Sequence, residues 1–168
     1  MKKLTTLLCL LFALCAFPTF AQHVRVDADM EQRSNTQTSK RYRVGDMVQI
    51  GGELGIVFAV TTDGQHGKAM STSQTQKKWD DAKAWCAQLG RGWRLPLLDE
   101  WRMIFNKKSE LNAHLEANGY THIANSWHWA SESKDSGRAW YVDMTNGDTD
   151  TDDYYEYYSG SVRAVSAF

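Results

Sequence analysis

Two separate parts of the chain have the hydrophobic pattern of β-strands: Gly55 to Val60 is a continuous apolar run, and residues 127–129 and 140–144 alternate in the period-two pattern of half-buried strands. The turn residues Asp63-Gly64 and Asn146-Gly147 interrupt these stretches and favour tight connections between antiparallel neighbours. The pattern therefore predicts two groups of strands, an early one at residues 44–50, 55–60 and 68–71 and a late one at 127–129, 140–144 and 162–168.

Between the two groups, the spacing of apolar residues changes to three and four, which indicates helices. The clearest helix runs from Trp79 to Leu89, where Gly90 provides a stop signal. Ser73 followed three residues later by Gln76 has the pattern of a capping box ahead of this helix.

A second helix is expected after Leu95, because a residue before proline is extended and Pro96 is suited to a first helical position. The apolar stripe passes through Phe105 and continues at Leu111 and Leu115. Strands, two main helices and then strands again predict an α+β class with antiparallel sheets, rather than a parallel βαβ fold.

The first 21 residues have the pattern of an export signal, with positive charges followed by the apolar stretch Leu4–Phe17 and small residues up to a cleavage site after Ala21. Residues 22–41 are polar and are interpreted as a tether, which leaves 42–168 as one domain. We therefore expect an exported protein, in the periplasm, at the cell surface or secreted, without a membrane span once the signal is removed.

Net charge and cysteine content argue against two classes of protein, nucleic-acid-binding proteins and disulfide-stabilised domains. Without Lys2 and Lys3, the 19 Lys plus Arg fall to 17 against 20 Asp plus Glu, a net charge of −3 that gives no general attraction to nucleic acid. Cys86 is the only cysteine left after the signal, so no internal disulfide can form, and its place on an apolar helix stripe suggests packing rather than reactivity.

Four motifs in order resemble the bacterial exported domains of the collagen-like-adhesin C-terminal (Lcl) type, a family similar to the C-type-lectin and sulfatase-modifying-factor folds. They are Gly92-Trp93-Arg94-Leu95-Pro96 with Glu100-Trp101, Trp129-Ala130-Ser131-Glu132, Ala139 to Gly147, and Val162-Arg163-Ala164-Val165. The resemblance covers about 42–168 and implies a C-type-lectin-like fold in which N- and C-terminal strands pair, with roles in adhesion or ligand display.

Two departures from the family pattern bear on single residues. The family has Thr after the proline, where this chain has Leu97, so the next helix is expected to be less well capped. Glu132 is displaced by one position relative to the family acid, and in a strand this change reverses the face on which a side chain lies. No role is assigned to Glu132 on this basis.

The residues do not point to catalysis or to a resident cofactor. The sulfatase-modifying enzymes of similar fold need a cysteine pair, whereas this chain has only Cys86 after the signal. Serine hydrolysis is not indicated either, because no serine lies in a nucleophile-elbow pattern. The five histidines lack the spacing of a zinc site. The acidic residues from Asp148 onward are a weak candidate for a calcium site. An EF-hand loop starting at Asp148 needs Gly and Glu where this chain has Asp153 and Ser159. A solvated acidic loop is therefore the expected structure.

The segment before the last strand is the expected binding region. Tyrosine beside acidic and small residues gives large contact area at low entropic cost and adds hydrogen-bonding groups. The alternative is a strand whose tyrosines pack on both faces. The candidate ligand-binding residues are Asp150, Asp152, Asp153, Tyr154, Tyr155, Tyr157 and Tyr158.

The sequence thus favours a non-catalytic adhesion or ligand-binding domain that recognises a glycan or a protein. One alternative is a structural or assembly subunit of a cell-envelope complex, in which the tyrosine segment is buried against a partner chain. Another is a diversified target of a retroelement, because related lectin-like proteins carry many Tyr, Asp, Ser and Asn near the C-terminus.

Overall fold

The computed structural model describes residues 40–153 and 158–168, which form nine strands and three helices. The predicted signal and most of the predicted tether lie outside these residues. In chain order the elements are β1 (Met47–Ile50), β2 (Glu53–Val60), β3 (Gly67–Ser71), β4 (Thr75–Lys77), α2 (Trp79–Gln88), α3 (Leu98–Asn106), α4 (Lys108–Ala117), β5 (Trp127–Ser133), β6 (Arg138–Asp143), β7 (Thr149–Asp153), β8 (Gly160–Val162) and β9 (Val165–Ala167).

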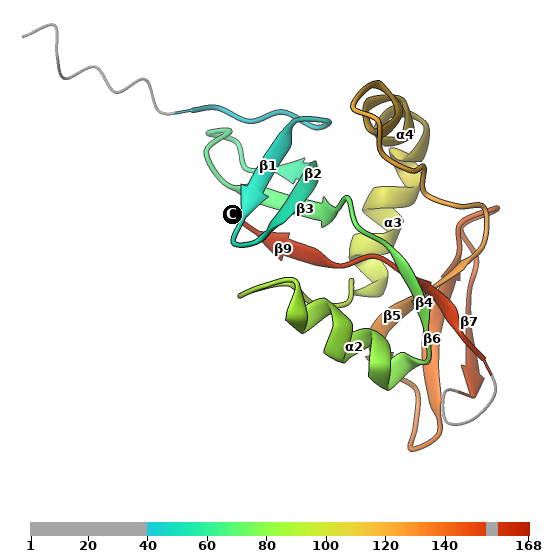
Figure 1. Ribbon diagram of the computed structural model, residues 1–168. Coiled ribbons are helices and arrows are strands. Elements are labelled where there is room, and N and C mark those ends of the chain that lie inside the picture. The colour runs from blue at the N-terminus through green and yellow to red at the C-terminus, as the bar shows by residue number, and fades with distance from the viewer. Residues whose placement is uncertain (1–39, 154–157) are drawn as a thin grey trace, which may run out of the picture. The chain divides into compact units, whose positions relative to one another are not determined.

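The strands form two sheets, and the chain passes between them twice (Figure 1). The first sheet has the order β1-β2-β3-β9 and is antiparallel throughout. The second has the order β4-β8-β5-β6-β7, in which β5 and β8 are parallel neighbours and the other pairs are antiparallel. The α+β class with largely antiparallel sheets is confirmed, and the C-terminal strand β9 pairs with β3 of the early meander.

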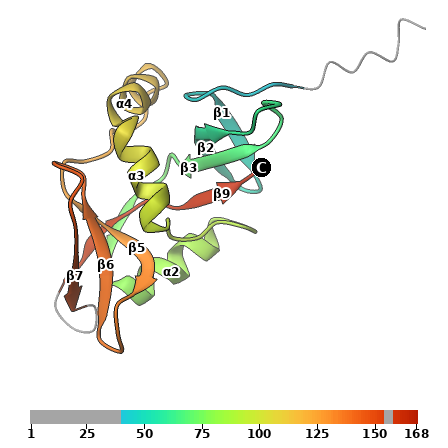
Figure 2. The ribbon, with the colours of Figure 1, turned by 180° about the vertical axis from the view of Figure 1, so that it is seen from behind.

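Helices α2 and α3 lie on opposite sides of the strands β8 and β9 (Figures 1 and 2). The core on the α3 side also includes α4 and is built from Ile56, Phe58, Met70, Trp101, Ile104, Leu111, Leu115, Val142 and Val165. The core on the α2 side contains Trp79, Ala82, Cys86, Trp93, Trp129, Val162 and Ala164. Because successive residues of a strand face opposite sides, Val142 and Tyr141 of β6 belong to different cores.

The first helix begins at Trp79, and the predicted capping box at Ser73 was wrong. The Ser73 N–H donates to Oε1 of Glu53 at 2.9 Å, and its hydroxyl donates to Oε2 at 3.1 Å. Residues 75–77 form β4 and pair with β8 instead of entering the helix. A strand partner more than 80 residues away, which local spacing does not reveal, therefore decided the conformation here.

The second apolar stripe is divided into two helices, so the prediction of two main helices was also wrong. Leu97 is extended, with φ −72° and ψ 158°, and α3 begins at Leu98 rather than at Pro96. Lys107, with φ −113° and ψ 8°, ends α3 and precedes α4. Within the described ranges, no helix is both long and apolar enough to cross a membrane.

Candidate functional site

A polar cavity of about 480 Å³ opens on the outer strands of the second sheet. It is lined by Tyr141, Asp143, Asn146, Asp148, Thr149 and Asp150, from β6, β7 and the turn between them. Tyr141 lies directly opposite Asp150 in the antiparallel register. Residues directly opposite in a sheet share a face, so the phenol ring and the carboxylate are neighbours in the cavity.

The turn between β6 and β7 is fixed by its own side chains. Oδ1 of Asn146 accepts the N–H of Asp148 at 3.0 Å, and Nδ2 of Asn146 donates to Oδ2 of Asp148 at 2.7 Å. Gly147 has φ 85°, and a Cβ there would lie 2.7 Å from the ring of Phe105. Glycine is therefore required both by the left-handed backbone and by the lack of space. The Asn-Gly turn predicted from the sequence is confirmed.

Asp143, at the end of β6, is held as an anion. Its Oδ1 accepts the N–H of Thr145 at 2.8 Å, and hydrogen bonds from the backbone and the hydroxyl of Thr145 lower the pKa of Asp143. Burial opposes this shift, and the positive charge of Lys108 supports it. The carboxylate is therefore ionised at neutral pH and acts as a hydrogen-bond acceptor.

A row of aromatic rings adjoins the cavity. The Trp127 ring centroid lies 5.4 Å from that of Tyr141 and 5.2 Å from that of Trp129, the latter pair at an interplanar angle of 88°. Trp127 is opposite Asp143 in the register and is half-buried. A Cβ at Gly160 would lie 2.6 Å from the Trp127 ring, so the chain returns to the sheet in close contact with these rings.

The sequence-predicted site residues have different outcomes. Asp150 is exposed and lines the cavity, and Tyr158 is 50% exposed. Asp152 and Asp153 lie in the backbone of β7, opposite Ala139 and Arg138. The remaining candidates, Tyr154, Tyr155 and Tyr157, lie outside the described residues.

The expectation of a solvated acidic loop was wrong for residues 149–153, which form the edge strand β7. Acidic residues have low strand propensity, but pairing with β6 along five residue pairs overrides it. Sequence reasoning also missed Tyr141, Asp143, Asn146 and Asp148. The signal was available, because a hairpin at Asn146-Gly147 brings the alternate residues on its two sides onto one face.

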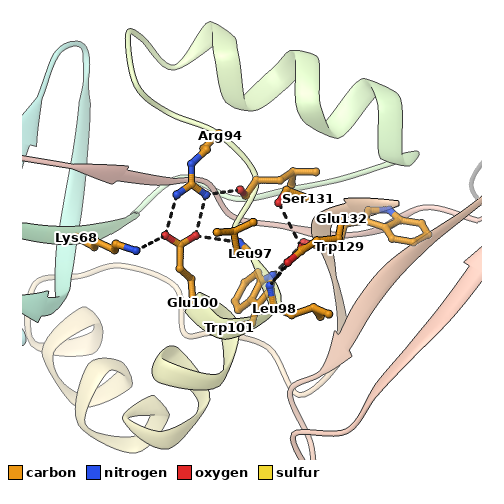
Figure 3. Close-up of polar contacts among 10 residues, drawn as sticks. Lys68, Arg94, Leu97, Leu98, Glu100, Trp101, Trp129, Ser131 and Glu132 are labelled. Carbon is orange, nitrogen blue, oxygen red and sulfur yellow. Dashed lines mark hydrogen bonds and ion pairs between the residues drawn. The ribbon is translucent and has the colours of Figure 1, made fainter. Parts of the chain in front are cut away.

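A second polar cluster surrounds the buried carboxylate of Glu100, shown in Figure 3. Arg94 donates to both carboxylate oxygens at 2.7 and 2.8 Å, Lys68 donates to Oε1 at 2.8 Å, and the Leu97 N–H donates to Oε2 at 2.9 Å. Burial alone would raise the pKa of Glu100, but these bonds lower it to about 2. A permanently ionised carboxylate with occupied oxygens is suited to holding α3 against β3, not to proton transfer.

Glu132 has a structural role that the sequence reasoning did not assign. The Leu98 N–H donates to its two oxygens at 3.0 and 3.2 Å, so the carboxylate of a β5 residue caps the N-terminus of α3 (Figure 3). The helix start is thus stabilised by a distant acid and by Glu100 at its third position, in place of a side chain at Leu97.

Replacing Leu97 with threonine is expected to raise the free energy of unfolding by roughly 1 kcal/mol. Leu97 occupies the N-cap position of α3 without a side-chain hydrogen bond and is 41% exposed, so little apolar contact is lost. Urea unfolding measures the effect, with Leu97→Val as the β-branched control that lacks a hydroxyl. Equal stability of the two variants would contradict the capping argument.

Two further titratable side chains, Cys86 and His128, are buried and held neutral at pH 7. Burial raises the pKa of the Cys86 thiol to about 12, which keeps it protonated. His128 is buried, and burial lowers its pKa to about 4. Among the residues that the structure describes, no group of three or more His, Cys, Asp or Glu side chains is placed to hold a metal ion.

Comparison with known proteins gives no family for the chain. No protein-family model matches the sequence, and no curated protein matches it either.

Proposed function

We propose that this protein is an exported, non-catalytic binding domain with a C-type-lectin-like fold, which recognises a glycan through the polar cavity on β6 and β7. The observation that carries the proposal is the Tyr141 ring placed among the carboxylates of Asp143, Asp148 and Asp150 in one cavity. Aromatic faces stack on sugar rings, and ionised carboxylates accept hydrogen bonds from sugar hydroxyls.

Three features support this reading. The cavity has the size of small-molecule sites, which span roughly 300 to 1,000 Å³. Its turn is preorganised by the bonds between Asn146 and Asp148, so little ordering entropy is lost on binding. Tyr158 is an exposed aromatic side chain two residues before Gly160, where the chain contacts the Trp127 ring.

The fold supports the lectin-like assignment in outline. The C-terminal strand β9 returns to the early meander by pairing with β3, and α2 and α3 flank the strands that connect the sheets. Export rests on the signal pattern of residues 1–21, and a ligand-display role fits a domain with an exposed, preorganised polar cavity.

The proposal is tested by changing Asp148 and Asp150 to asparagine in the exported form, residues 22–168, and measuring binding to a glycan array. The double variant is expected to lose roughly tenfold or more in affinity for any glycan that the parent binds, because two charge-assisted hydrogen bonds weaken. A matched control changes Asp80 and Asp81, two exposed acids at the start of α2, to asparagine and removes the same charge elsewhere.

Three results would oppose the proposal. Binding that both double variants retain, or lose equally, would remove the cavity from recognition. Binding of proteins but of no glycan would assign the cavity to a protein partner. A stable oligomer, detected by light scattering and dissociated by the Asp148 and Asp150 changes, would favour the assembly subunit.

A further inference from the structure

An apolar groove runs along the end of β2, where it faces α3. Two adjoining cavities of about 380 and 430 Å³ make up this groove, and they share the lining residues Ala59, Val60 and Met103. The first cavity continues to Ala167 and Phe168, and the second continues to Val44, Phe58 and Lys107. The groove lies on the first sheet and is separate from the polar cavity on β6 and β7.

The backbone shapes this groove. The register between β2 and β3 shifts between Val57 and Ala59, a bulge that alters which side chains the strand end presents. Val60 is left 38% exposed at the groove. Gly67 lies opposite it, where a Cβ would be 2.3 Å from the Ala59 carbonyl oxygen and 2.9 Å from the Phe168 ring. The close approach of Phe168 therefore depends on the absence of a side chain at position 67.

The charges on the groove favour an anion at the α3 end. The titratable side chains that line it are Lys68, His66 and Lys107, with no side-chain carboxylate among them. At the Phe168 end of the groove, Lys68 forms an ion pair with Glu100 at 2.8 Å. At that end a main-chain oxygen of Phe168 also accepts the Gly67 N–H. Within residues 40–153 and 158–168, no carboxylate lies within ion-pair distance of Lys107.

We propose that this groove binds a single-chain fatty acid, with the carboxylate at Lys107 and the alkyl chain along Ala59, Val60 and Met103 toward Phe168. An elongated apolar cavity with a basic group at one end matches a linear amphiphile with an anionic head. This inference is independent of the proposed glycan site.

Calorimetric titration of residues 22–168 with monomeric dodecanoate, below its micelle concentration, tests the proposal. We expect saturable binding of one dodecanoate molecule per chain. Dodecylammonium, which has the opposite charge, should bind at least roughly fivefold more weakly than dodecanoate. Among the carboxylates, affinity should rise about fourfold per methylene from octanoate until the groove is filled. Lys107→Gln is expected to weaken dodecanoate binding roughly two- to fivefold. It should leave the affinity for the neutral dodecanol unchanged.

The groove itself is tested by Val60→Glu against Leu97→Glu. Both residues are exposed apolar side chains, at 38% and 41%, but Leu97 lies outside the groove, so a folded Leu97→Glu protein controls for added charge. Loss of dodecanoate binding only in Val60→Glu, with unchanged circular dichroism, supports the proposal. The proposal would be overturned if the two variants had equal effects or if the parent showed no saturable binding. It would also be overturned if the protein bound phosphatidylglycerol vesicles but not monomeric dodecanoate.

Discussion

Replacing Arg163 with methionine is expected to lower the free energy of unfolding by about 2 to 4 kcal/mol. The side chain is fully buried between β8 and β9. Its guanidinium donates to five acceptors: the carbonyl oxygens of Ser71 at 2.9 Å, Thr72 at 3.2 Å, Thr121 at 2.6 Å and His122 at 3.2 Å, and Oε1 of Gln74 at 2.9 Å. Methionine would leave these groups without their donor, and a buried unpaired acceptor is costly.

Arg163 joins three segments that are distant in the sequence. It lies on the connection from β8 to β9, and its acceptors lie at the end of β3 and just after it, and between α4 and β5. Burial lowers the pKa of Arg163 to about 10, and the negative charge of Glu53 opposes that shift, so the guanidinium is still protonated at neutral pH. The desolvation cost is therefore present in the folded protein and is offset by the hydrogen bonds.

Urea unfolding of Arg163→Met, Arg163→Lys and Arg102→Met measures the effect. Arg102 is 59% exposed and bonds to Asp99 on the helix surface, so its replacement should cost less than about 0.5 kcal/mol. Lysine at 163 should recover little of the loss, because a single ammonium cannot reach acceptors on two separate segments as a planar guanidinium does. A cost below about 1 kcal/mol for Arg163→Met would show that the five contacts do not stabilise the fold.

The sequence predicted those elements whose signal is local. The spacing of Trp79, Ala82 and Cys86 identified α2 to within a residue. A continuous apolar run located β2 and alternating residues located β6, because the pattern of a buried face is visible in consecutive positions. Trp140 alternates with Val142 and Met144 in the sequence and packs against the same core as they do, but it is half-buried.

The features that the sequence did not reveal depend on partners far along the chain. β4 is a strand because β8, more than 80 residues away, pairs with it. Glu132 caps a helix that begins 34 residues earlier, and the acceptors of Arg163 lie 41 to 92 residues away. The polar cavity differs from these features, because the hairpin at Asn146-Gly147 that places Asp143 and Asp150 in one cavity is a local signal.

The free energy of unfolding is expected to fall by about 3 kcal/mol as the pH is lowered from 6.5 to 4, because of His128. The ring is buried, its Nδ1 lies 3.0 Å from the Ser126 carbonyl oxygen, and its centroid lies 5.0 Å from that of Trp101. Burial lowers the pKa of His128 to about 4, and the positive charges of Arg163 and Lys108 reinforce this shift. The hydrogen bond to the Ser126 backbone and the negative charge of Asp143 oppose it.

The direction of the effect follows from which state binds the proton first. In the unfolded chain His128 takes up a proton as the pH falls below about 6.5, whereas in the fold it resists protonation until about pH 4. Stability is therefore complete above pH 6.5, declines between 6.5 and 4, and levels off below that range with respect to this group. Glu100 has a pKa lowered to about 2 from 4.5, so its contribution is lost at lower pH, mainly below 4.5.

Urea unfolding at pH 7.5, 6.0 and 5.0 separates His128 from the other histidines. The His128→Gln variant should lose most of the slope over this range whatever its stability at pH 7.5, while His66→Gln, at an exposed position outside the core, should keep the parent slope. A parent protein with constant stability from pH 7.5 to 5.0 would mean that His128 is charged as easily in the fold as in water. The buried contact between His128 and Trp101 would then have to open to solvent at mildly acidic pH, because burying a charged imidazolium is costly.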